Sequence, residues 1–264
     1  MTMGHNERIY TVKLENLTLG YGERILFREA NIGFGWGEFT ALIGRNGTGK
    51  STLLRTISGL VKPLSGKIIV DGIDLSDMSS KEIASRISFV STEEVRITNL
   101  KVIDVVGLGR APYTNWIGSL TAEDRRKVDE SLSLVGISGF AYKSMDTLSD
   151  GERQRVMIAR ALAQDTPIIL LDEPTAFLDL PNRYEICILL RELAHKQGKS
   201  IIFSTHDLSI ALELCDTIAM IESGNFYYGT AEKLIAGNEI QRLFEGTSLR
   251  FDPVGNNVRL KKRE

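Results

Sequence analysis

The pattern of apolar and polar residues in the N-terminal part of the chain predicts strands joined by glycine-rich turns. Residues 9–21 alternate between apolar and polar side chains, which is typical of a strand with one buried face. A glycine-rich turn at residues 33–37 leads into a second strand at 39–44. Residues 50–60 carry apolar side chains at helical spacing. The order is therefore strand, glycine loop, helix.

The middle of the chain changes from strands to helices. The predicted elements are strands at residues 67–71 and 87–90, a short helix at 79–86 capped by Ser79 or Ser80, and longer helices at 121–135 and 151–163. Because the two longer helices stand together without an intervening strand, we expect a helical insert at about residues 92–160.

The C-terminal part returns to an alternation of strands and helices. Residues 168–172 and 200–204 are continuous apolar runs, the kind that is buried on both faces of a parallel sheet. The predicted elements that remain are a helix at 183–195, two short strands within 217–228 and a last helix at 231–244. Strand, helix and strand in this order predict an α/β core with right-handed crossovers.

Composition limits the class of protein. Of the 264 residues, 42% are hydrophobic and 25% charged, which suits a folded chain with a buried core. Cys187 and Cys215 lie in apolar stretches, so we expect free thiols in a reducing compartment. The net charge of -2 means that the protein has no overall positive field to attract nucleic acid. The basic segment at residues 259–263 is short, so we interpret it as a solvated tail and not as a patch that touches a membrane. We find no apolar run long enough to span a membrane and no signal peptide, and expect a soluble, unexported chain.

The loop between the strand at 39–44 and the following helix fits a phosphate-binding pattern. Residues 44–51, with the sequence GRNGTGKS, match G-x-x-x-x-G-K-[ST], the Walker A loop. The strand before it and the helix after it would aim backbone N–H groups at phosphate. Lys50 would reach the β and γ oxygens, and Ser51 would ligate Mg²⁺. The alternative is a glycine-rich turn that only starts a helix.

Two further strand ends carry candidate catalytic groups. Asp172 and Glu173 end the apolar strand at 168–172, and their side chains diverge because successive residues on a strand point apart. Asp172 would hold Mg²⁺, while Glu173 would polarise the water that attacks the γ-phosphate. His206 follows the strand at 200–204 and is a candidate γ-phosphate contact. Taken alone, each of these strand ends is also compatible with a purely structural role.

Residues 148–155, LSDGERQR, resemble the LSGGQ signature of ABC (ATP-binding cassette) ATPases. Residues 173–179 resemble the family's Walker B exit and D-loop, residues 204–207 its H-switch, and Tyr21 its adenine-stacking residue. The resemblance covers about residues 9–245. It implies an α/β P-loop NTPase (RecA-like) cassette with an antiparallel β subdomain and a helical insert. The catalytic core would take about residues 1–91 and 161–245, the helical subdomain 92–160, and a C-terminal tail 246–264.

The resemblance also assigns roles to individual residues. It implies catalysis by Glu173, His206 and Lys50, metal binding by Ser51 and Asp172, and a D-loop link between two sites through Asp179. The residues implied in binding ATP are Tyr21, Gly44, Arg45, Asn46, Gly47, Thr48, Gly49, Lys50, Ser51 and Thr52. The signature residues Ser149, Asp150, Gly151 and Glu152 would cap the ATP held by the opposite subunit of a homodimer. In isolation, the same Ser-x-Gly-Glu start is a plain helix N-cap.

Two positions depart from the family pattern. Asp150 stands where the first signature glycine is usual, which places a carboxylate near the expected phosphate unless it turns away or pairs with an arginine. Thr92 occupies the place of the Q-loop glutamine, with Glu93 beside it. We hypothesise that this hinge still couples transport to ATP, but with altered metal geometry. An unchanged rate and Mg²⁺ dependence in Thr92→Gln would contradict that hypothesis.

Residues 107–124 resemble the helical insert of importer subunits for iron-siderophore, haem and vitamin B12. This likeness implies ATP and Mg²⁺ as cofactors, permease partners in the membrane, an indirect extracytoplasmic binding-protein partner, and a peripheral place on the cytoplasmic face of the membrane. Tyr113 and Trp116 are candidates for the permease contact, unless they pack inside the insert. The alternative function is a soluble single-cassette ABC protein, such as a component of iron–sulfur assembly.

Overall fold

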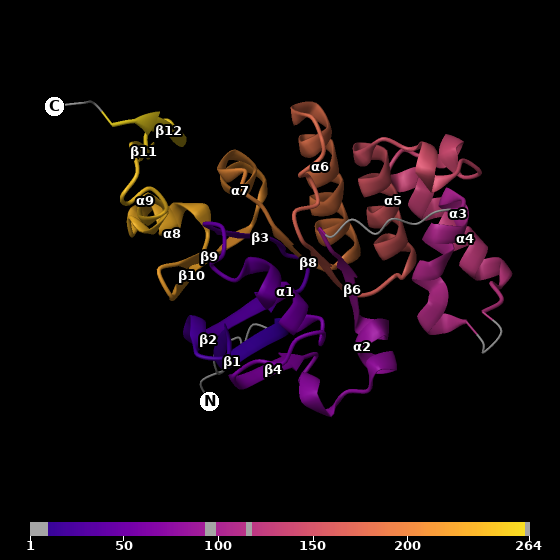
Figure 1. Ribbon diagram of the computed structural model, residues 1–264, viewed down its shortest axis with the longest axis horizontal. Coiled ribbons are helices and arrows are strands. Elements are labelled where there is room, and N and C mark those ends of the chain that lie inside the picture. Colours follow the sequence, from indigo (N-terminus) through magenta and orange to yellow (C-terminus); the bar gives the residue numbers. More distant parts are fainter. Residues whose placement is uncertain (1–9, 93–98, 115–117, 262–264) are drawn as a thin grey trace, which may run out of the picture.

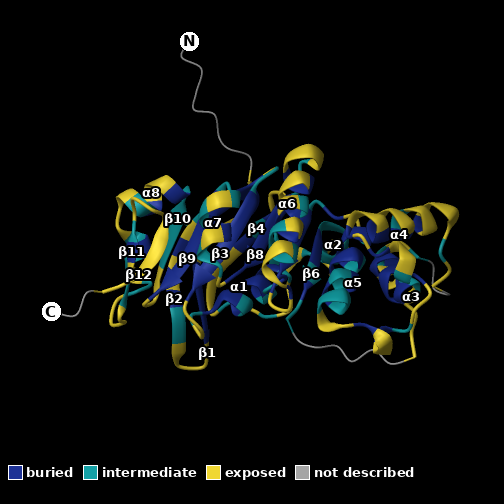
Figure 2. Ribbon diagram, turned by 90° about the horizontal axis from the view of Figure 1, so that it is seen from above, coloured by how far each residue is buried: buried dark blue, intermediate teal, exposed yellow. Residues whose placement is uncertain are grey.

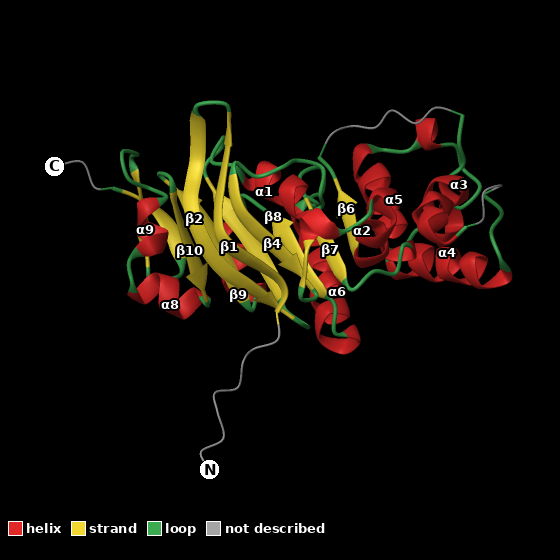
Figure 3. Ribbon diagram, turned by 90° about the horizontal axis from the view of Figure 1, so that it is seen from below, coloured by secondary structure: helices red, strands yellow, loops and turns green. Residues whose placement is uncertain are grey.

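The computed structural model describes residues 10–92, 99–114 and 118–261. Figure 1 shows antiparallel strands at the bottom, the central sheet above them, and a group of helices to the right. The same separation is visible from below in Figure 3, where β1, β2 and β4 lie in front of the central strands. The predicted α/β class is confirmed, with the helical insert set to one side.

The antiparallel sheet begins with the predicted alternating strand. Its order is β2-β1-β4-β5. The strands are β1 (Tyr10–Tyr21), β2 (Arg24–Gly35), β4 (Ser65–Val70) and β5 (Ile73–Asp74). Val12 and Leu14 of β1 are buried, as alternation requires, and an irregularity in the β1–β2 register between Leu14 and Leu17 then shifts which residues face inward.

The central sheet has the order β10-β9-β3-β8-β7-β6. Its strands are β3 (Phe39–Gly44), β6 (Ile87–Val90), β7 (Ile168–Leu171), β8 (Ser200–Ser204), β9 (Thr217–Glu222) and β10 (Asn225–Gly229). Neighbours from β9 to β6 run parallel, while β10 pairs antiparallel with β9. Every residue of β7 and β8 is buried, which confirms that the continuous apolar runs are doubly covered strands. Figure 2 shows β8 and the strands around it, β3 and β9, in dark blue.

Alternate residues of the central strands face two hydrophobic clusters. Leu42 and Ile202 join the cluster that contains Leu53 of α1 and the antiparallel sheet. Phe39 and Phe203 face the other cluster and stack with ring centroids 4.6 Å apart. The helices in the core region are α1 (Lys50–Ile57), η1 (Leu75–Asp77), α2 (Ser80–Arg86), α6 (Leu180–Gln197) and α7 (Leu208–Leu214). Of the two caps proposed for α2, Ser79 is the one used, in a capping box with Glu82.

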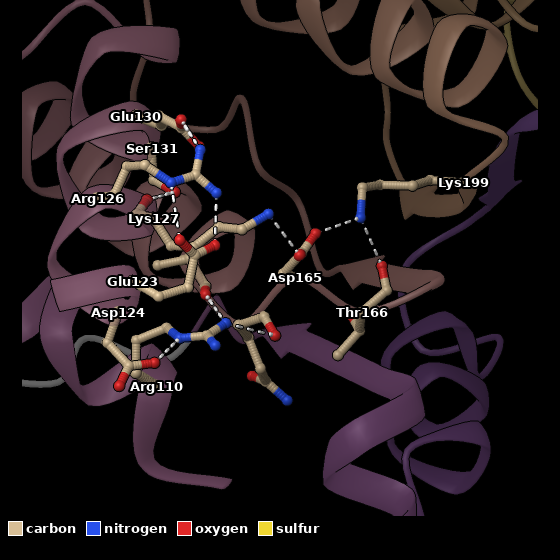
Figure 4. Close-up of polar contacts among 12 residues, drawn as sticks. Arg110, Glu123, Asp124, Arg126, Lys127, Glu130, Ser131, Asp165, Thr166 and Lys199 are labelled. Atoms are coloured by element: carbon tan, nitrogen blue, oxygen red, sulfur yellow. Dashed lines mark hydrogen bonds and ion pairs between the residues drawn. The ribbon is translucent and has the colours of Figure 1, made fainter. Parts of the chain in front are cut away.

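The helical insert packs against the core at the β6 edge of the sheet (Figure 1). Its helices are α3 (Val102–Gly107), η2 (Leu108–Tyr113), α4 (Ala122–Leu134), η3 (Ser138–Phe140), η4 (Met145–Thr147) and α5 (Asp150–Ala163). Figure 4 shows the salt bridges between the insert and the core: Asp165 pairs with Lys127 of α4 at 2.7 Å and with Lys199 at 3.1 Å.

The C-terminal part differs from the sequence prediction. The single helix predicted at 231–244 is wrong, because Gly237 and Asn238 divide it into α8 (Ala231–Ala236) and α9 (Glu239–Arg242). Asn238 has a left-handed backbone (φ 59°), which no helix can continue through. Within the predicted tail, β11 (Leu249–Asp252) and β12 (Asn257–Leu260) form a hairpin. Among the described residues, no helix is long and apolar enough to cross a membrane.

Candidate functional site

The glycine loop between β3 and α1 has the backbone that a phosphate cradle requires. Gly44, Gly47 and Gly49 have φ values of 152°, 78° and 112°. At Gly44 a Cβ atom would lie 2.4 Å from the carbonyl oxygen of Ile221, so a side chain is excluded there on steric grounds as well. The loop ends at the N-terminus of α1, where free N–H groups favour an anion.

Lys50 is folded into this loop. Its side chain is buried, and Nζ donates hydrogen bonds to the carbonyl oxygens of Gly44 at 2.9 Å and Arg45 at 3.2 Å. Burial lowers the pKa of Lys50 from its ordinary value, and the carboxylates of Glu173 and Asp172 partly offset that effect. The ammonium is thus desolvated before any ligand arrives, which strengthens its attraction for phosphate.

Asp172 lies beside the loop and is surrounded by hydroxyl groups. Ser51 donates to Oδ1 at 3.0 Å, Ser204 donates to Oδ1 at 2.6 Å, and Thr92 donates to Oδ2 at 2.8 Å. Carboxylate and hydroxyl oxygens suit Mg²⁺, which proteins usually hold with one or two carboxylates together with substrate phosphates. No cluster of three or more histidine, cysteine or acidic side chains able to bind a metal exists in the described ranges.

Glu173 and His206 form a contact at the adjacent strand ends. His206 Nε2 lies 2.8 Å from Glu173 Oε1, and the Glu173 backbone N–H donates to Ser204 Oγ at 2.8 Å. Glu173 has a left-handed backbone (φ 49°), a costly conformation of the kind that is found at functional sites. The pair opens into a cavity of about 510 Å³ that Val258 of the C-terminal hairpin also lines. A proton acceptor beside an open space can activate a bound water molecule.

The other predicted ATP-binding residues lie around the same loop. Tyr21 is exposed, and its hydroxyl lies 2.9 Å from Thr52 Oγ1 in the first turns of α1. Thr48 Oγ1 donates to the Arg45 carbonyl oxygen, and Asn46 is exposed at the tip of the loop. The Arg45 guanidinium donates to the carbonyl oxygens of Leu243 and Glu245, so this side chain ties the loop to the C-terminal segment.

The signature residues form the N-terminus of α5. Ser149 is the N-cap, in a capping box with Glu152: Ser149 N donates to Glu152 Oε2 at 2.7 Å, and Glu152 N donates to Ser149 Oγ at 3.3 Å. Asp150 pairs with Arg153, which is one of the two arrangements foreseen for its carboxylate. A Cβ atom at Gly151 would lie 3.1 Å from Leu178 Cδ2, so the signature abuts the segment before Asp179.

The signature and the phosphate loop of one chain are not joined directly. No hydrogen bond within the described part of the chain links residues 149–152 to residues 44–51. Asp179 caps α6 by accepting from the N–H of Asn182 at 3.2 Å. Within one chain, Ser149 acts as the N-cap of α5, as the N-cap interpretation requires.

Four residues near the insert were predicted from the sequence to take part in the site or in the permease contact. Thr92 contacts Asp172, whereas Glu93 and Trp116 lie outside the described residues. Tyr113 is 42% exposed, with the Arg110 guanidinium 4.1 Å from its ring centroid. It packs on one face and remains accessible, so both the contact role and the packing role stay open. Val258 and the residues that Arg45 contacts, Leu243 and Glu245, were not predicted to belong to the site, and Ser204 was named only as the first residue of the H-switch motif.

Comparisons with known proteins agree with this geometry. Residues 27–176 match the family model described as ABC transporter. The chain is 37% identical over 234 residues to the probable siderophore transport system ATP-binding protein YusV of Bacillus subtilis, covering 88% of this chain and 85% of that one. It is similar to a putative metal-chelate type ABC transporter in an inward-facing conformation (TM-score 0.78, 30% identity, 89% and 88% covered). It is also similar to the dimeric bacterial ABC transporter cassette MJ0796 (TM-score 0.74, 32% identity, 83% and 98% covered).

Proposed function

The chain belongs to the ABC transporter family, and from that premise we propose that it is the ATP-hydrolysing subunit of an importer for an iron-siderophore or a related metal chelate. As an ABC cassette, it binds and hydrolyses ATP. The observation that carries the proposal is the meeting of Lys50, Asp172 and the Glu173–His206 pair around one glycine loop.

Each group has a distinct task in ATP hydrolysis. The loop N–H groups and Lys50 hold the phosphates, and the ammonium balances negative charge at the β and γ oxygens. Ser51 and Asp172 hold Mg²⁺, which neutralises phosphate charge when bound. Glu173 accepts a proton from the attacking water, and His206, within hydrogen-bond distance of Glu173, contacts the γ-phosphate.

The catalytic unit is a homodimer with two ATP sites. Ser149, Asp150, Gly151 and Glu152 of one copy cap the nucleotide of the other, and Asp179 links the two sites. The dimeric state of the related MJ0796 cassette supports this. Closure of the dimer brings the signature N-terminus of α5 to the phosphate.

The dimer works on the cytoplasmic face of the membrane with integral permease subunits and, through them, an extracytoplasmic binding protein. The name of the Bacillus relative, a siderophore transport component, supports the chelate class. Within each subunit, the catalytic core consists of about residues 1–91 and 161–245. The helical subdomain consists of about residues 92–160, and residues 246–264 form the C-terminal tail. Tyr113 contributes to the permease contact, and no nucleic acid takes part.

The test is to purify the chain from membranes together with whatever binds it. ATP hydrolysis is then measured with iron-chelate, haem or cobalamin plus the matching binding protein, and without them. A co-purifying permease with stimulation by one ligand supports the importer and names its cargo. ATP hydrolysis without a permease points to a soluble ABC role instead, such as iron–sulfur assembly.

A further inference from the structure

The carboxylate of Asp172 is oriented by side chains from three separate segments. Two hydroxyl groups, those of Ser51 and Ser204, donate to Oδ1, while Thr92 donates to Oδ2. Asp172 is only 1% exposed, so water contributes little to the placement of either oxygen. In so buried a position, the direction of a carboxylate depends on its protein donors.

Strand pairing explains why Thr92 can reach Asp172 from a site 80 residues away. The strands β6 and β7 are parallel neighbours, with Val90 opposite Leu171. The Asp172 N–H continues this pairing by donating to the Val90 carbonyl oxygen at 2.8 Å. Thr92 therefore stands at the same edge of the sheet as Asp172, at the point where the chain leaves the core toward α3.

We propose that Thr92 is a positioning residue for the metal site: its hydroxyl holds Oδ2 of Asp172, so that Oδ1 stays turned toward Ser51. This inference rests on the proposed function. The shared oxygen Oδ1 faces the phosphate loop, whereas Oδ2 has Thr92 as its partner. Among the described residues Thr92 is the donor to Oδ2, so its loss deprives this oxygen of a buried carboxylate of that hydrogen bond and allows the carboxylate to rotate. Residues that orient a metal ligand in this way commonly change metal affinity by about 10- to 100-fold when they are removed.

The experiment measures metal-dependent nucleotide binding rather than turnover. Binding of a fluorescent ATP analogue is titrated with MgCl₂ in the full-length wild type, Thr92→Val and Thr92→Ser, and again in EDTA. Valine keeps the branched shape and removes the hydroxyl, while serine keeps the hydroxyl. We expect Thr92→Val to need about ten times more Mg²⁺ for half-maximal enhancement. We expect Thr92→Ser to follow the wild type, and all three proteins to bind alike in EDTA.

A matched control comes from β6, the strand that precedes Thr92. Ser88 of β6 has a buried hydroxyl without a hydrogen-bond partner in the described residues, so Ser88→Ala deletes a hydroxyl nearby but should leave the Mg²⁺ titration unchanged. Equal Mg²⁺ dependence of Thr92→Val and wild type would overturn the inference, as would a Thr92→Ser variant as impaired as Thr92→Val. If the wild type bound no nucleotide at all, the proposed function would fall and this inference with it.

Discussion

Arg110 allows the stability of the helical insert to be tested quantitatively. Its Nε atom lies 2.8 Å from Asp124 Oδ1, and one terminal nitrogen donates to the Ala163 carbonyl oxygen at 2.8 Å (Figure 4). The two charged side chains are only 9% and 5% exposed. Arg110 thus joins η2, α4 and the end of α5 through one guanidinium.

Arg110→Met removes the charge and these hydrogen bonds while it keeps an apolar stem. Breaking a buried pair from one side usually costs about 3–5 kcal/mol, because the remaining charge is uncompensated. Asp124 retains hydrogen bonds from the N–H and hydroxyl of Thr121, at 2.9 and 2.7 Å, so we expect the lower end, about 3 kcal/mol. For a chain of this length, that corresponds to a melting temperature lower by about 6–12 °C.

The assay is urea unfolding followed by circular dichroism, with two variants as controls. Arg126→Met breaks exposed pairs with Glu123 and Glu130 on the same helix, so its cost should stay below about 1 kcal/mol. Adding Asp124→Asn to Arg110→Met removes the uncompensated charge and should restore part of the loss. A loss below about 1 kcal/mol for Arg110→Met, or no recovery in the double variant, would refute the reasoning.

The pair also predicts a pH dependence. The Thr121 hydrogen bonds, aided by Arg110, lower the pKa of Asp124 to about 2. Because the folded pKa lies below the unfolded value, this stabilisation is complete above the ordinary pKa and is lost as the pH falls toward 2. The difference between wild type and Arg110→Met should therefore be the same at pH 7 and pH 5, and shrink only below about pH 4.

Further predictions concern the nucleotide site. Glu173→Gln keeps the size of the side chain, so we expect ATP binding and a trapped dimer with hydrolysis reduced by about 10²- to 10⁴-fold; wild-type phosphate release would remove Glu173 from the role of general base. Because burial lowers the pKa of Lys50, ATP affinity should begin to fall at a pH below the ordinary lysine value of 10.5, whereas Lys50→Arg should bind with little pH dependence over the same range; the check is a nucleotide titration from pH 7 to 10. Arg153→Ala frees the Asp150 carboxylate and should weaken ATP-driven dimerisation by up to about fivefold, measured by light scattering, with recovery when Asp150→Gly is added. Unchanged dimerisation in Arg153→Ala would show that the ion pair does not restrain Asp150.

Local patterns were sufficient for the elements that carry the core. Alternation predicted β1, continuous apolar runs predicted β7 and β8, and Ser79 was one of two caps named for α2. These features depend on neighbouring residues, so the information lies within a short window of sequence. The break at Gly237 and Asn238 was equally local, since both residues disfavour helix interiors, but the apolar spacing around them favoured one continuous helix.

Contacts between segments far apart in the sequence could not be predicted from the pattern of apolar and polar residues. Arg45 was predicted as an ATP-binding residue, yet its guanidinium also fastens the phosphate loop to Leu243 and Glu245, about 200 residues later. Likewise, Val258 reaches the cavity of Glu173 and His206 from a hairpin within the predicted tail. Such contacts depend on tertiary packing. The hydrophobic periodicities of strands (2 residues) and helices (3.6 residues) contain no information about them.

Strand order explains why the site residues meet although they are scattered along the chain. From β3 toward the β6 edge, the parallel strands of the central sheet follow the order β3, β8, β7, β6, whereas their order in the sequence is β3, β6, β7, β8. The segments that follow them carry Lys50, His206, Asp172 and Thr92, respectively. Because parallel strands place their carboxyl ends at one edge, insertion of β8 beside β3 brings Ser204 within reach of Asp172 and the phosphate loop.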